Sequence, residues 1–511
     1  MLHVVSANEM RAMDAHTINN LKVPSAVLME RAALGLAGEV IAAGKEHPGR
    51  ILIVCGSGNN GGDGAALARI LFIKGYRPEL LLLGKEERFS PDMAAQMESC
   101  RLLGIPETRE ADMGAYAVIV DAIFGTGLCR EVGGSAREAI EAINASGAYV
   151  ISADIPSGIS ADSGQVFGLA VRADVTVTME CAKIGQLLYP GALYTGRLVI
   201  SEIGIYDDEK LRDVFPMSVF SLTDGDLKNL LPPRDPAGNK GSFGKVLVIA
   251  GSRGMCGAAL FAAEAALRGG CGMVKVLTEE ANRVIVQTAL PEALFASYGD
   301  PEEALREAEK GLAWADVTVI GPGLGQAESA RRLLSFVLEN AEQPLVIDAD
   351  GLNILAELKR AEPACLGGRR SKSPVFLTPH MGEMARLSGK SIPDLKKDPL
   401  GEAFHFAREE GVGLLMKDAK TVIAGPDTRV WINTSGNSGM AAAGSGDVLA
   451  GLLGSLLAQG TEPGHAGALA AFLHGKAGDI AAERMGEAGM GARDILRCLP
   501  EALRGESTIR I

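Results

Sequence analysis

The chain has 511 residues, of which 47% are hydrophobic and 22% are charged, and its formal net charge is −13. Because a single hydrophobic core rarely grows beyond about 250–300 residues, this length predicts at least two folded domains. The negative charge argues against a nucleic-acid-binding surface, which needs a basic stripe, but not against a small anion held by backbone amides.

The N-terminal half begins with helix and continues with alternating elements. Residues 6–46 are expected to be helical, and Ser6 with Glu9 has the spacing of a capping box. From residue 50 onward, short apolar runs alternate with amphipathic stretches, which predicts βαβ units and a mostly parallel sheet. The runs expected to form buried strands are 51–55, 79–83, 117–121, 149–153, 174–179 and 198–203.

A second α/β series follows a break in this pattern. Residues 206–245 lack clear periodicity, and the segment 231–238 is rich in proline. We place the domain boundary near residue 215, which gives domains of 1–215 and 216–511 that share no repeated motif. Strands of the second series are expected at 246–250, 274–277, 317–320, 345–347, 375–377, 413–416, 421–424 and 430–432.

A glycine-rich loop, GSGNNGGDG, follows the strand 51–55. It satisfies the GxGxxG pattern between a strand and a helix, which directs backbone amides and a helix dipole at a phosphate. A tight turn without a ligand is the alternative interpretation. Asn59, Asn60 and Asp63 add side-chain carbonyls and a carboxylate, which suit a ligand together with a bound cation.

Polar residues also follow two other strands of the first domain. Asp121 precedes the GTG segment 125–127, and Asp154 precedes the IPSG segment 155–158. Ligands bind outside the carboxyl ends of the strands in an open parallel sheet. We therefore expect Asp63, Asp121 and Asp154 to converge, although each taken alone could be a helix cap.

The first domain resembles the NAD(P)H-hydrate epimerases, the YjeF N-terminal domain family. The matching segments are 58–64 (GNNGGDG), 121–128 (DAIFGTGL), 154–158 (DIPSG), 176–178 (TVT) and 183–185 (KIG). The resemblance implies a Rossmann-like three-layer fold that binds hydrated NADH or NADPH (NADHX or NADPHX), with inversion at C6 of the hydrated ring. Asp154 is our candidate for the catalytic carboxylate. Ser57 stands where the family often has proline, and we expect little consequence.

The resemblance also implies a set of binding residues. Substrate contacts are expected from Asn59, Asn60, Gly61, Gly62, Asp63, Gly125, Thr126, Gly127, Leu128, Cys129, Arg130, Glu131 and Asp154. A potassium ion is expected at Asn60, Asp121 and Ser157.

The strongest chemical signal of the second domain is the segment 444–447 (GSGD), which precedes an apolar helix over 448–457. The glycines allow consecutive amides to face one point, and the helix adds its positive end, so the segment predicts an anion hole for phosphoryl oxygens. Asp447 can take a proton from a hydroxyl as phosphate moves onto it. A capped glycine turn is the alternative, but the upstream loop 433–440 is longer than a cap requires.

The GSGD arrangement resembles the ribokinase superfamily, and further segments resemble the ADP-dependent (S)-NAD(P)H-hydrate dehydratases over about 225–500. These segments are 240–245, 250–252, 257–259, 321–325, 347–353, 378–384 and 417–421. The resemblance implies substrate contacts by Ala258, Gly323, His380 and Asp447, and nucleotide contacts by Lys417, Asp418, Ala419, Lys420, Thr421 and Gly446. It also implies ADP or ATP with Mg²⁺. Met381 and Ala443 stand where proline and glycine are common.

Several side chains of this domain keep a second interpretation. His380 is structural or belongs to the site, and its position after a strand favours the site. Asp348 and Asp350 cap a helix or bind magnesium through water, with equal weight. Lys417 pairs with phosphate or lies on the surface, and its place at a strand end favours phosphate.

The two resemblances together predict an enzyme that epimerises NADHX or NADPHX and dehydrates the S epimer at the expense of ADP or ATP. Phosphorylation converts the C6 hydroxyl into a good leaving group, and an epimerase in the same chain supplies the other epimer. A small-molecule kinase of the hydroxymethylpyrimidine or hydroxyethylthiazole type is the competing interpretation, and a non-catalytic nucleotide sensor is a third. The resemblance favours ADP over ATP as the nucleotide. It also implies that the protein forms a homo-oligomer.

The cysteines and the hydropathy bear on the compartment. The eight cysteines form no CxxC pair, so we expect buried thiols and no zinc. No apolar stretch reaches the length of a membrane span, and the N-terminus lacks a basic region followed by an apolar core. We therefore expect a cytoplasmic protein without membrane association.

Overall fold

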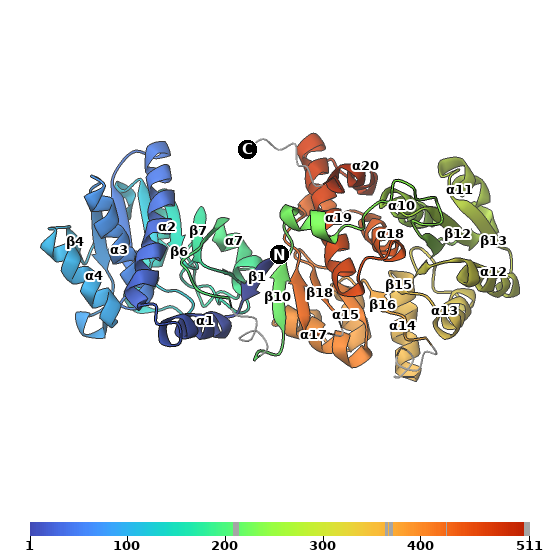
Figure 1. The fold of residues 1–511 in the computed structure, drawn as a ribbon, viewed down its shortest axis with the longest axis horizontal. Helices are drawn as coiled ribbons and strands as arrows, with labels where there is room; N and C mark the ends of the chain where they lie inside the picture. The colour runs from blue at the N-terminus through green and yellow to red at the C-terminus, as the bar shows by residue number, and fades with distance from the viewer. Residues whose placement is uncertain (208–213, 363–365, 367–370, 426, 505–511) are drawn as a thin grey trace. The chain divides into compact units, whose positions relative to one another are not determined.

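The computed structural model describes residues 1–207, 214–362, 366, 371–425 and 427–504. The chain divides into two compact units (Figure 1). The N-terminal unit is Leu2–Val219, and the C-terminal unit is Phe220–Ile511 together with Met1. Both units are mixed α/β, as the alternating sequence pattern predicts.

The N-terminal unit contains a parallel seven-stranded sheet in the order β4-β3-β2-β5-β6-β7-β9. Its strands are β2 (Ile51–Cys55), β3 (Pro78–Leu82), β4 (Glu107–Thr108), β5 (Val118–Ala122), β6 (Tyr149–Ala153), β7 (Val175–Met179) and β9 (Arg197–Ser201). Two further strands, β1 (Leu2–Val5) and β8 (Ala182–Lys183), pair in parallel with each other. The six strands expected from apolar runs are present, whereas β1, β4 and β8 have at most four residues and give no periodic signal.

Helices cover both faces of this sheet. They are α1 (Ala7–Asn19), α2 (Ser25–Glu46), α3 (Asn59–Ile73), α4 (Pro91–Leu102), α5 (Gly134–Ala145), α6 (Ile184–Leu187) and α7 (Ala192–Thr195). Alternate residues of β2 point to opposite faces, so Ile51 and Ile53 pack with α2 and α3 while Leu52 and Val54 pack with α5. The result is the expected three-layer arrangement. The capping box is also confirmed, since the Ser6 hydroxyl accepts from Glu9 N and the Glu9 carboxylate accepts from Ser6 N.

The C-terminal unit contains strands in the order β13-β12-β11-β14-β15-β16-β17-β18-β19, which are parallel up to β17 and antiparallel beyond it. They are β11 (Lys245–Ile249), β12 (Met273–Glu279), β13 (Leu294–Tyr298), β14 (Val317–Ile320), β15 (Leu345–Ile347), β16 (Val375–Leu377), β17 (Gly413–Met416), β18 (Val422–Ala424) and β19 (Arg429–Ile432). Sequence reasoning missed β13, an edge strand that is mostly not buried and therefore lacks a continuous apolar run. It also missed β10 (Ser218–Ser221), which lies in the region without clear periodicity.

The helices of the C-terminal unit follow the same alternation. They are α9 (Leu227–Leu230), α10 (Cys256–Arg268), α11 (Arg283–Ala289), α12 (Pro301–Trp314), α13 (Glu328–Asn340), α14 (Asp350–Ala361), α15 (Met381–Ser388), α16 (Ile392–Leu395), α17 (Pro399–Glu410), α18 (Ser445–Ala458), α19 (Pro463–Met485) and α20 (Ala492–Ala502). No helix of the described ranges is long and apolar enough to cross a membrane.

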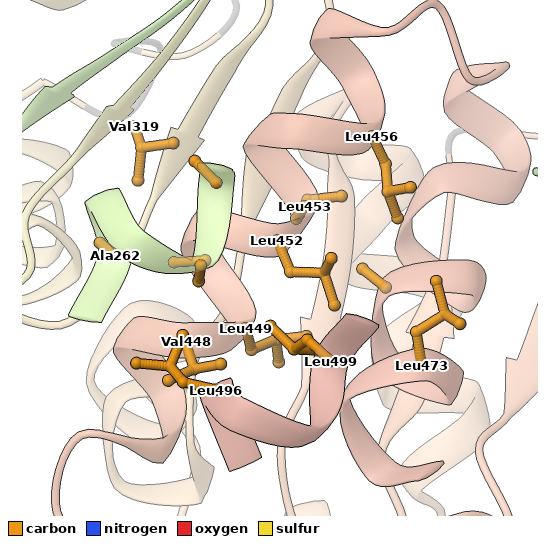
Figure 2. Packing of buried hydrophobic residues seen from close by; sticks show 14 of the residues in the cluster. Ala262, Val319, Val448, Leu449, Leu452, Leu453, Leu456, Leu473, Leu496 and Leu499 are labelled. Carbon is orange, nitrogen blue, oxygen red and sulfur yellow. The ribbon is translucent and has the colours of Figure 1, made fainter. Parts of the chain in front are cut away.

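Helix α18 lies at the centre of the C-terminal core. Its apolar side chains, among them Leu449, Leu452 and Leu456, are buried with residues of α10, β14, α19 and α20 (Figure 2). Gly451 and Gly454 allow close contact, because added Cβ atoms would lie 2.0 Å from the Ala262 carbonyl oxygen and 2.5 Å from Val319 Cγ2. Each fully buried leucine contributes about 2–3 kcal/mol. This packing fixes the position of the helix, and with it the residues of its first turn.

The cysteines only partly follow the expectation of buried thiols. Within the described residues Cys55, Cys100, Cys181, Cys256, Cys271 and Cys498 are buried. The expectation is wrong for Cys129, which is exposed because it lies in the loop after β5. Cys365 lies outside the described residues.

Candidate active sites

The N-terminal unit contains a cavity of about 560 Å³ at the carboxyl ends of its central strands. Its wall combines side chains of α1 and α2 with the loops that follow β2, β5 and β6. This is the edge at which open parallel sheets bind ligands. The glycine-rich loop therefore opens onto a cavity of the size that holds a small molecule.

Most of the substrate-binding residues expected for this unit line the cavity. They are Asn59, Asn60, Asp63, Gly125, Thr126, Gly127, Leu128, Cys129, Arg130 and Asp154. Gly61, Gly62 and Glu131 do not belong to the wall. Gly61 and Gly62 are buried in the first turn of α3, where added Cβ atoms would lie 2.0 Å from the Gly56 carbonyl oxygen and 2.6 Å from Met29 Cε. These two glycines therefore serve close backbone packing, and Glu131 is exposed beyond the cavity.

Asp154 is held in one conformation at the end of β6. Its φ is +65°, a left-handed conformation that costs a non-glycine residue about 1–3 kcal/mol and that persists where surrounding contacts enforce it. Its carboxylate Oδ1 accepts a hydrogen bond of 2.6 Å from Lys183 Nζ, and its carbonyl oxygen accepts one of 2.6 Å from Gln186 Nε2. Sequence reasoning did not assign Lys183 to the site, because its only signal was the matching KIG segment.

The cavity is strongly acidic around Asp63. Burial and the charges of Asp154, Asp14 and Asp92 raise the pKa of Asp63 well above its usual value. Burial and the charge of Asp92 also raise the pKa of Asp14. Asp14 and Asp92 line the same cavity but were not expected from the sequence, since they lie on α1 and α4 outside the glycine-rich segments. This environment favours the protonated form of Asp63.

Asp121 lies beneath the cavity and is not part of its wall. It is fully buried and accepts hydrogen bonds from Ser152 Oγ at 2.9 Å, Ser157 N at 2.9 Å and Ser157 Oγ at 2.6 Å. Burial raises the pKa of Asp121 although these hydrogen bonds oppose the shift. Of the three expected aspartates, Asp63 and Asp154 therefore face the ligand space while Asp121 supports the loops around it.

Asn60 has buried polar atoms that no described residue satisfies. Both Oδ1 and Nδ2 are inaccessible to solvent and have no hydrogen-bond partner among the described residues. Leaving such an atom unpaired costs about 1–3 kcal/mol. The side chain is therefore suited to bind a ligand or a cation.

In the C-terminal unit, the start of α18 forms a positively polarised site. Gly444 precedes the helix with φ +91°, and a Cβ at this position would lie 2.7 Å from the Phe261 ring. A Cβ at Gly446 would lie 3.0 Å from Lys417 Nζ, so the ammonium group approaches the first turn directly. Free amides, a helix dipole and a cation at one place suit an anionic phosphoryl group.

Asp447 is the third residue of α18, and its pKa is shifted from the usual value of an aspartate. Burial and the charge of Asp348 raise its pKa to about 7, while Lys417 acts in the opposite direction. Lys417 Nζ donates to Asp348 Oδ1 at 2.9 Å, and Thr378 Oγ1 donates to the same oxygen at 2.7 Å. Burial would lower the pKa of Lys417, but Asp348 and Glu383 hold it above its usual value. Asp447 is therefore a carboxyl group that can exchange a proton near neutral pH.

His380 combines a capping role with an exposed side chain. It precedes α15, and its Nδ1 accepts hydrogen bonds from Gly382 N at 2.9 Å and Glu383 N at 3.3 Å. Burial and the charge of Lys417 lower the pKa of His380. The side chain is 56% exposed, and its Nε2 lies 3.5 Å from Glu383 Oε1. Glu383, which sequence reasoning did not assign, is mostly buried, and burial raises its pKa to about 7.

The remaining expected residues of this unit surround the same strand ends. An added Cβ at Gly323, where φ is +58°, would lie 2.9 Å from Ala258 Cβ, so these two positions are neighbours. Lys420 Nζ donates to the Thr434 carbonyl oxygen at 2.9 Å, and Asp418 forms an ion pair with Lys396. Ala419 is exposed, and the Thr421 carbonyl oxygen accepts from Asn433 N.

The structure bears on the two roles that the sequence left open for each of Asp348, Asp350 and Lys417. Helix α14 has no side-chain cap hydrogen bond from its N-cap residue, Ala349, and Asp350 Oδ2 instead accepts from Gly325 N at 2.9 Å. Lys417 does not lie free on the surface, because it is paired with the buried Asp348.

Comparison with known proteins decides the family. Residues 246–501 match the family described as NAD(P)H-hydrate dehydratase, and residues 25–185 match the YjeF-related protein N-terminus. The bifunctional NAD(P)H-hydrate repair enzyme of Moorella thermoacetica is 39% identical over 98% of this chain and 97% of its own length. The chain belongs to the family of bifunctional NAD(P)H-hydrate repair enzymes. A family member from Escherichia coli is 36% identical over 89% of this chain and 85% of its own length.

A solved structure supports the fold of the C-terminal unit of this repair enzyme. The ADP/ATP-dependent NAD(P)H-hydrate dehydratase of Bacillus subtilis, co-crystallised with ATP and Mg²⁺, is 31% identical with a TM-score of 0.50. The match covers 56% of this chain and 98% of that protein. The expected α/β fold, with a YjeF-type N-terminal unit and a dehydratase-like C-terminal unit, is confirmed.

Proposed function

We propose that this repair enzyme epimerises NADHX and NADPHX at the cavity of its N-terminal unit and dehydrates the S epimer at the start of α18, with ADP or ATP as phosphoryl donor. The observation that carries the proposal is that one chain matches both families. The first region contains Asp154 at the cavity wall, and the second contains Asp447 in the first turn of α18. A stereospecific dehydratase would leave one epimer unused, and an epimerase in the same chain returns it to the pathway.

The dehydration follows from kinase-like chemistry at α18. The C6 hydroxyl leaves poorly as hydroxide, so it first becomes a phosphate ester. Asp447 takes the hydroxyl proton as the oxygen attacks the terminal phosphorus, and the amides of the first turn with Lys417 stabilise the transferring group. Loss of phosphate from C6 and of a proton from the neighbouring ring carbon then restores the dihydropyridine. His380, Gly323 and Ala258 would contact the hydrate, and residues 417–421 with Gly446 the nucleotide.

Magnesium would enter this site with the nucleotide. No group of three His, Cys, Asp or Glu side chains in the described ranges is arranged to hold a metal ion. Mg²⁺ is commonly bound by substrate phosphates together with one or two carboxylates. Asp350 and Asp348, beside the start of α18, are the carboxylates that would complete its coordination, and the ion would neutralise charge on the transferring phosphoryl group.

Epimerisation is assigned to Asp154. Its carboxyl group lines the cavity and can give a proton to the C6 hydroxyl, which leaves as water with electron push from the ring nitrogen, and can take a proton back as water adds to the other face. Asn60, with its unpaired buried oxygen, fits a potassium ion, and the oxygens of Asp121 and Ser157 supply neighbouring ligands. Bound potassium would add positive charge beneath the ligand space.

We also propose a cytoplasmic homo-oligomer that binds neither nucleic acid nor membrane. The net charge of −13 supports the absence of a nucleic-acid surface. Helix α11 and the edge strand β13 expose Val284, Ile285 and Leu294, which suits contact with a second copy.

Incubation with a mixture of R and S NADHX, with and without ADP or ATP and Mg²⁺, tests the proposal. We expect nucleotide-dependent recovery of the whole mixture as NADH, followed by its absorbance. A stable phosphorylated product without NADH would instead identify a kinase of the hydroxymethylpyrimidine or hydroxyethylthiazole type. Tight nucleotide binding without turnover would indicate a sensor.

A further inference from the structure

Lys183 is a fully buried lysine beside the epimerase cavity, and its charge needs an explanation. Its side chain is 0% exposed. Burying an ammonium group costs several kcal/mol unless it is paired and hydrogen-bonded. Lysine is almost never fully buried without such partners. The contacts of its Nζ atom therefore indicate what the residue does.

All three hydrogens of the Lys183 ammonium are used inside the protein. Nζ donates to Asp154 Oδ1 at 2.6 Å, to Thr178 Oγ1 at 2.8 Å and to the Met179 carbonyl oxygen at 2.9 Å. An ammonium group has three donors, so none remains for a ligand. Although the side chain belongs to the cavity wall, its ammonium group therefore acts on the substrate through Asp154.

The backbone adds a second connection between the two residues. Lys183 N donates to Gln186 Oε1 at 2.7 Å, and Gln186 Nε2 donates to the Asp154 carbonyl oxygen at 2.6 Å. Both the side chain and the backbone of Asp154 are thus held by the segment 182–186. Oδ1 faces Lys183, whereas Oδ2 lies 3.2 Å from where a Cβ on Gly125 would be, at the cavity wall.

Lys183 also distinguishes Asp154 from the other acids of the cavity. Asp14, Asp63, Asp92 and Asp154 line the wall. Of these four within the described chain, Asp154 alone forms an ion pair. Lys183 holds one oxygen of Asp154, while burial and the charges of Asp154, Asp14 and Asp92 raise the pKa of Asp63.

We infer that Lys183 is a positioning residue of the epimerase site, which holds Oδ1 of Asp154 and leaves Oδ2 as the oxygen that exchanges a proton with the substrate. This inference rests on the proposed epimerase function. It adds a residue whose ammonium group acts on the reaction through Asp154. Its consequence is that Lys183 and Asp154 form one functional unit, so that loss of either one removes the effect of the other.

The test is a double-mutant cycle on the full-length enzyme, with conversion of R-NADHX to the S epimer followed by chromatography. Lys183→Met should lower kcat about 10²-fold while KM changes only a few-fold, because Asp154 loses its partner while the methionine fills the same part of the cavity wall. In the Asp154→Asn background, Lys183→Met should cause no further loss. Thr176→Val is the matched control, since it removes a buried hydrogen bond from strand β7 to the Thr195 carbonyl oxygen that does not involve Asp154.

A second variant guards against misfolding by Lys183→Met. Lys183→Gln keeps a polar side chain but no charge, so the limb of the kcat/KM pH profile that reports Asp154 should move upward by about one pH unit or more. A merely structural loss would lower the rate equally at each pH. The other charged or titratable groups that face or adjoin this cavity include Arg11, Asp14, Cys55, Asp63, Asp92, Cys129 and Arg130, and all are unchanged in both variants.

The outcomes separate the inference from the proposed function. A parent enzyme that does not epimerise, or an Asp154→Asn variant with parent activity, would remove the epimerase assignment itself. Full activity of folded Lys183→Met and Lys183→Gln, with Asp154→Asn inactive, would overturn only the role of Lys183. A further loss on adding Lys183→Met to Asp154→Asn would overturn it as well.

Discussion

Asp154 Oδ1 of the N-terminal unit accepts a hydrogen bond of 2.6 Å from Lys183 Nζ, whereas Asp447 of the C-terminal unit has no hydrogen-bonded cation among the described residues. The lysine nearest to the second site, Lys417, donates instead to Asp348. The same residue type is thus placed in two environments: a lysine holds the side chain of Asp154, whereas burial and the charge of Asp348 raise the pKa of Asp447 to about 7. Separate environments of this kind allow one chain to contain two different acid–base reactions.

The backbone around the two aspartates also differs. Asp154 itself adopts a positive φ, which the contacts with Lys183 and Gln186 enforce. Asp447 has ordinary helical geometry, and Gly444 provides the left-handed residue three positions earlier. Substitutions at the first site should therefore act through side-chain contacts, and those at the second through the helix start as well.

The largest effect is expected from Asp447→Asn. Without a base for the C6 hydroxyl, dehydration of S-NADHX should fall by about 10³–10⁴-fold, at the upper end for general-base residues. Recovery of NADH from pure S epimer with ADP or ATP measures the change. Epimerisation by the same variant is the control and should keep the parent rate, and equal loss of both reactions in folded protein would contradict the assignment of the two sites.

Asp154→Asn should have the next largest effect, limited to the other reaction. Conversion of R to S epimer should fall by about 10²–10³-fold because the asparagine cannot accept a proton. Dehydration of pure S epimer should stay at the parent rate. If the R epimer is still consumed as fast as in the parent enzyme, the epimerase assignment is wrong.

The pH dependence distinguishes the two aspartates further. Asp447 acts as a base only when it is ionised, and burial beside Asp348 raises its pKa to about 7. The rate of dehydration should therefore rise with pH, by about tenfold between pH 6 and pH 8 for one such group. Single-turnover rates with pure S epimer would check this, and a rate that is flat over the range would show that Asp447 is not the base.

The smallest effect is expected from Gly444→Ala, which tests the helix start. Alanine at φ +91° is strained by about 1–2 kcal/mol, and its Cβ would meet the Phe261 ring at 2.7 Å. The variant should unfold at lower denaturant concentration and lose dehydration several-fold. Gly460→Ala is the matched control, since Gly460 has φ +86° with nothing within 4 Å of an added Cβ. Equal effects of the two substitutions on activity would show that the position of α18 at Gly444 is unimportant.

The sequence was sufficient for the fold wherever apolar side chains follow a regular period. Strands such as β2 and β14 are buried along their whole length, so each forms a continuous apolar run. Strand β13 was missed because an edge strand is only partly buried, and β1 because four residues carry too little pattern. Burial on both faces, rather than strand formation itself, produces the readable signal.

Residues of the candidate sites could be predicted where they belong to sequence motifs. They could not be predicted where a contact between distant parts of the chain brings them together. Asp63, Asp154 and Asp447 follow from glycine-rich segments at strand ends or helix starts. The contact of Lys183 with Asp154 joins residues that are 29 positions apart, and the sequence gives no indication of such a distance in space. Gly61 and Gly62 were expected to contact the ligand, and the structure adds that Cβ atoms at these positions would meet Gly56 and Met29; sequence patterns do not separate these two uses of glycine.

The most direct test of two sites in one chain is complementation between the two aspartate variants. With mixed R and S NADHX, ADP and Mg²⁺, the Asp154→Asn enzyme should quickly recover only the S share as NADH. Addition of the Asp447→Asn enzyme, which is inactive in dehydration by itself, should then restore recovery of the remaining R share at the parent rate. Failure of the mixture to recover the R share, with both proteins folded, would contradict the account.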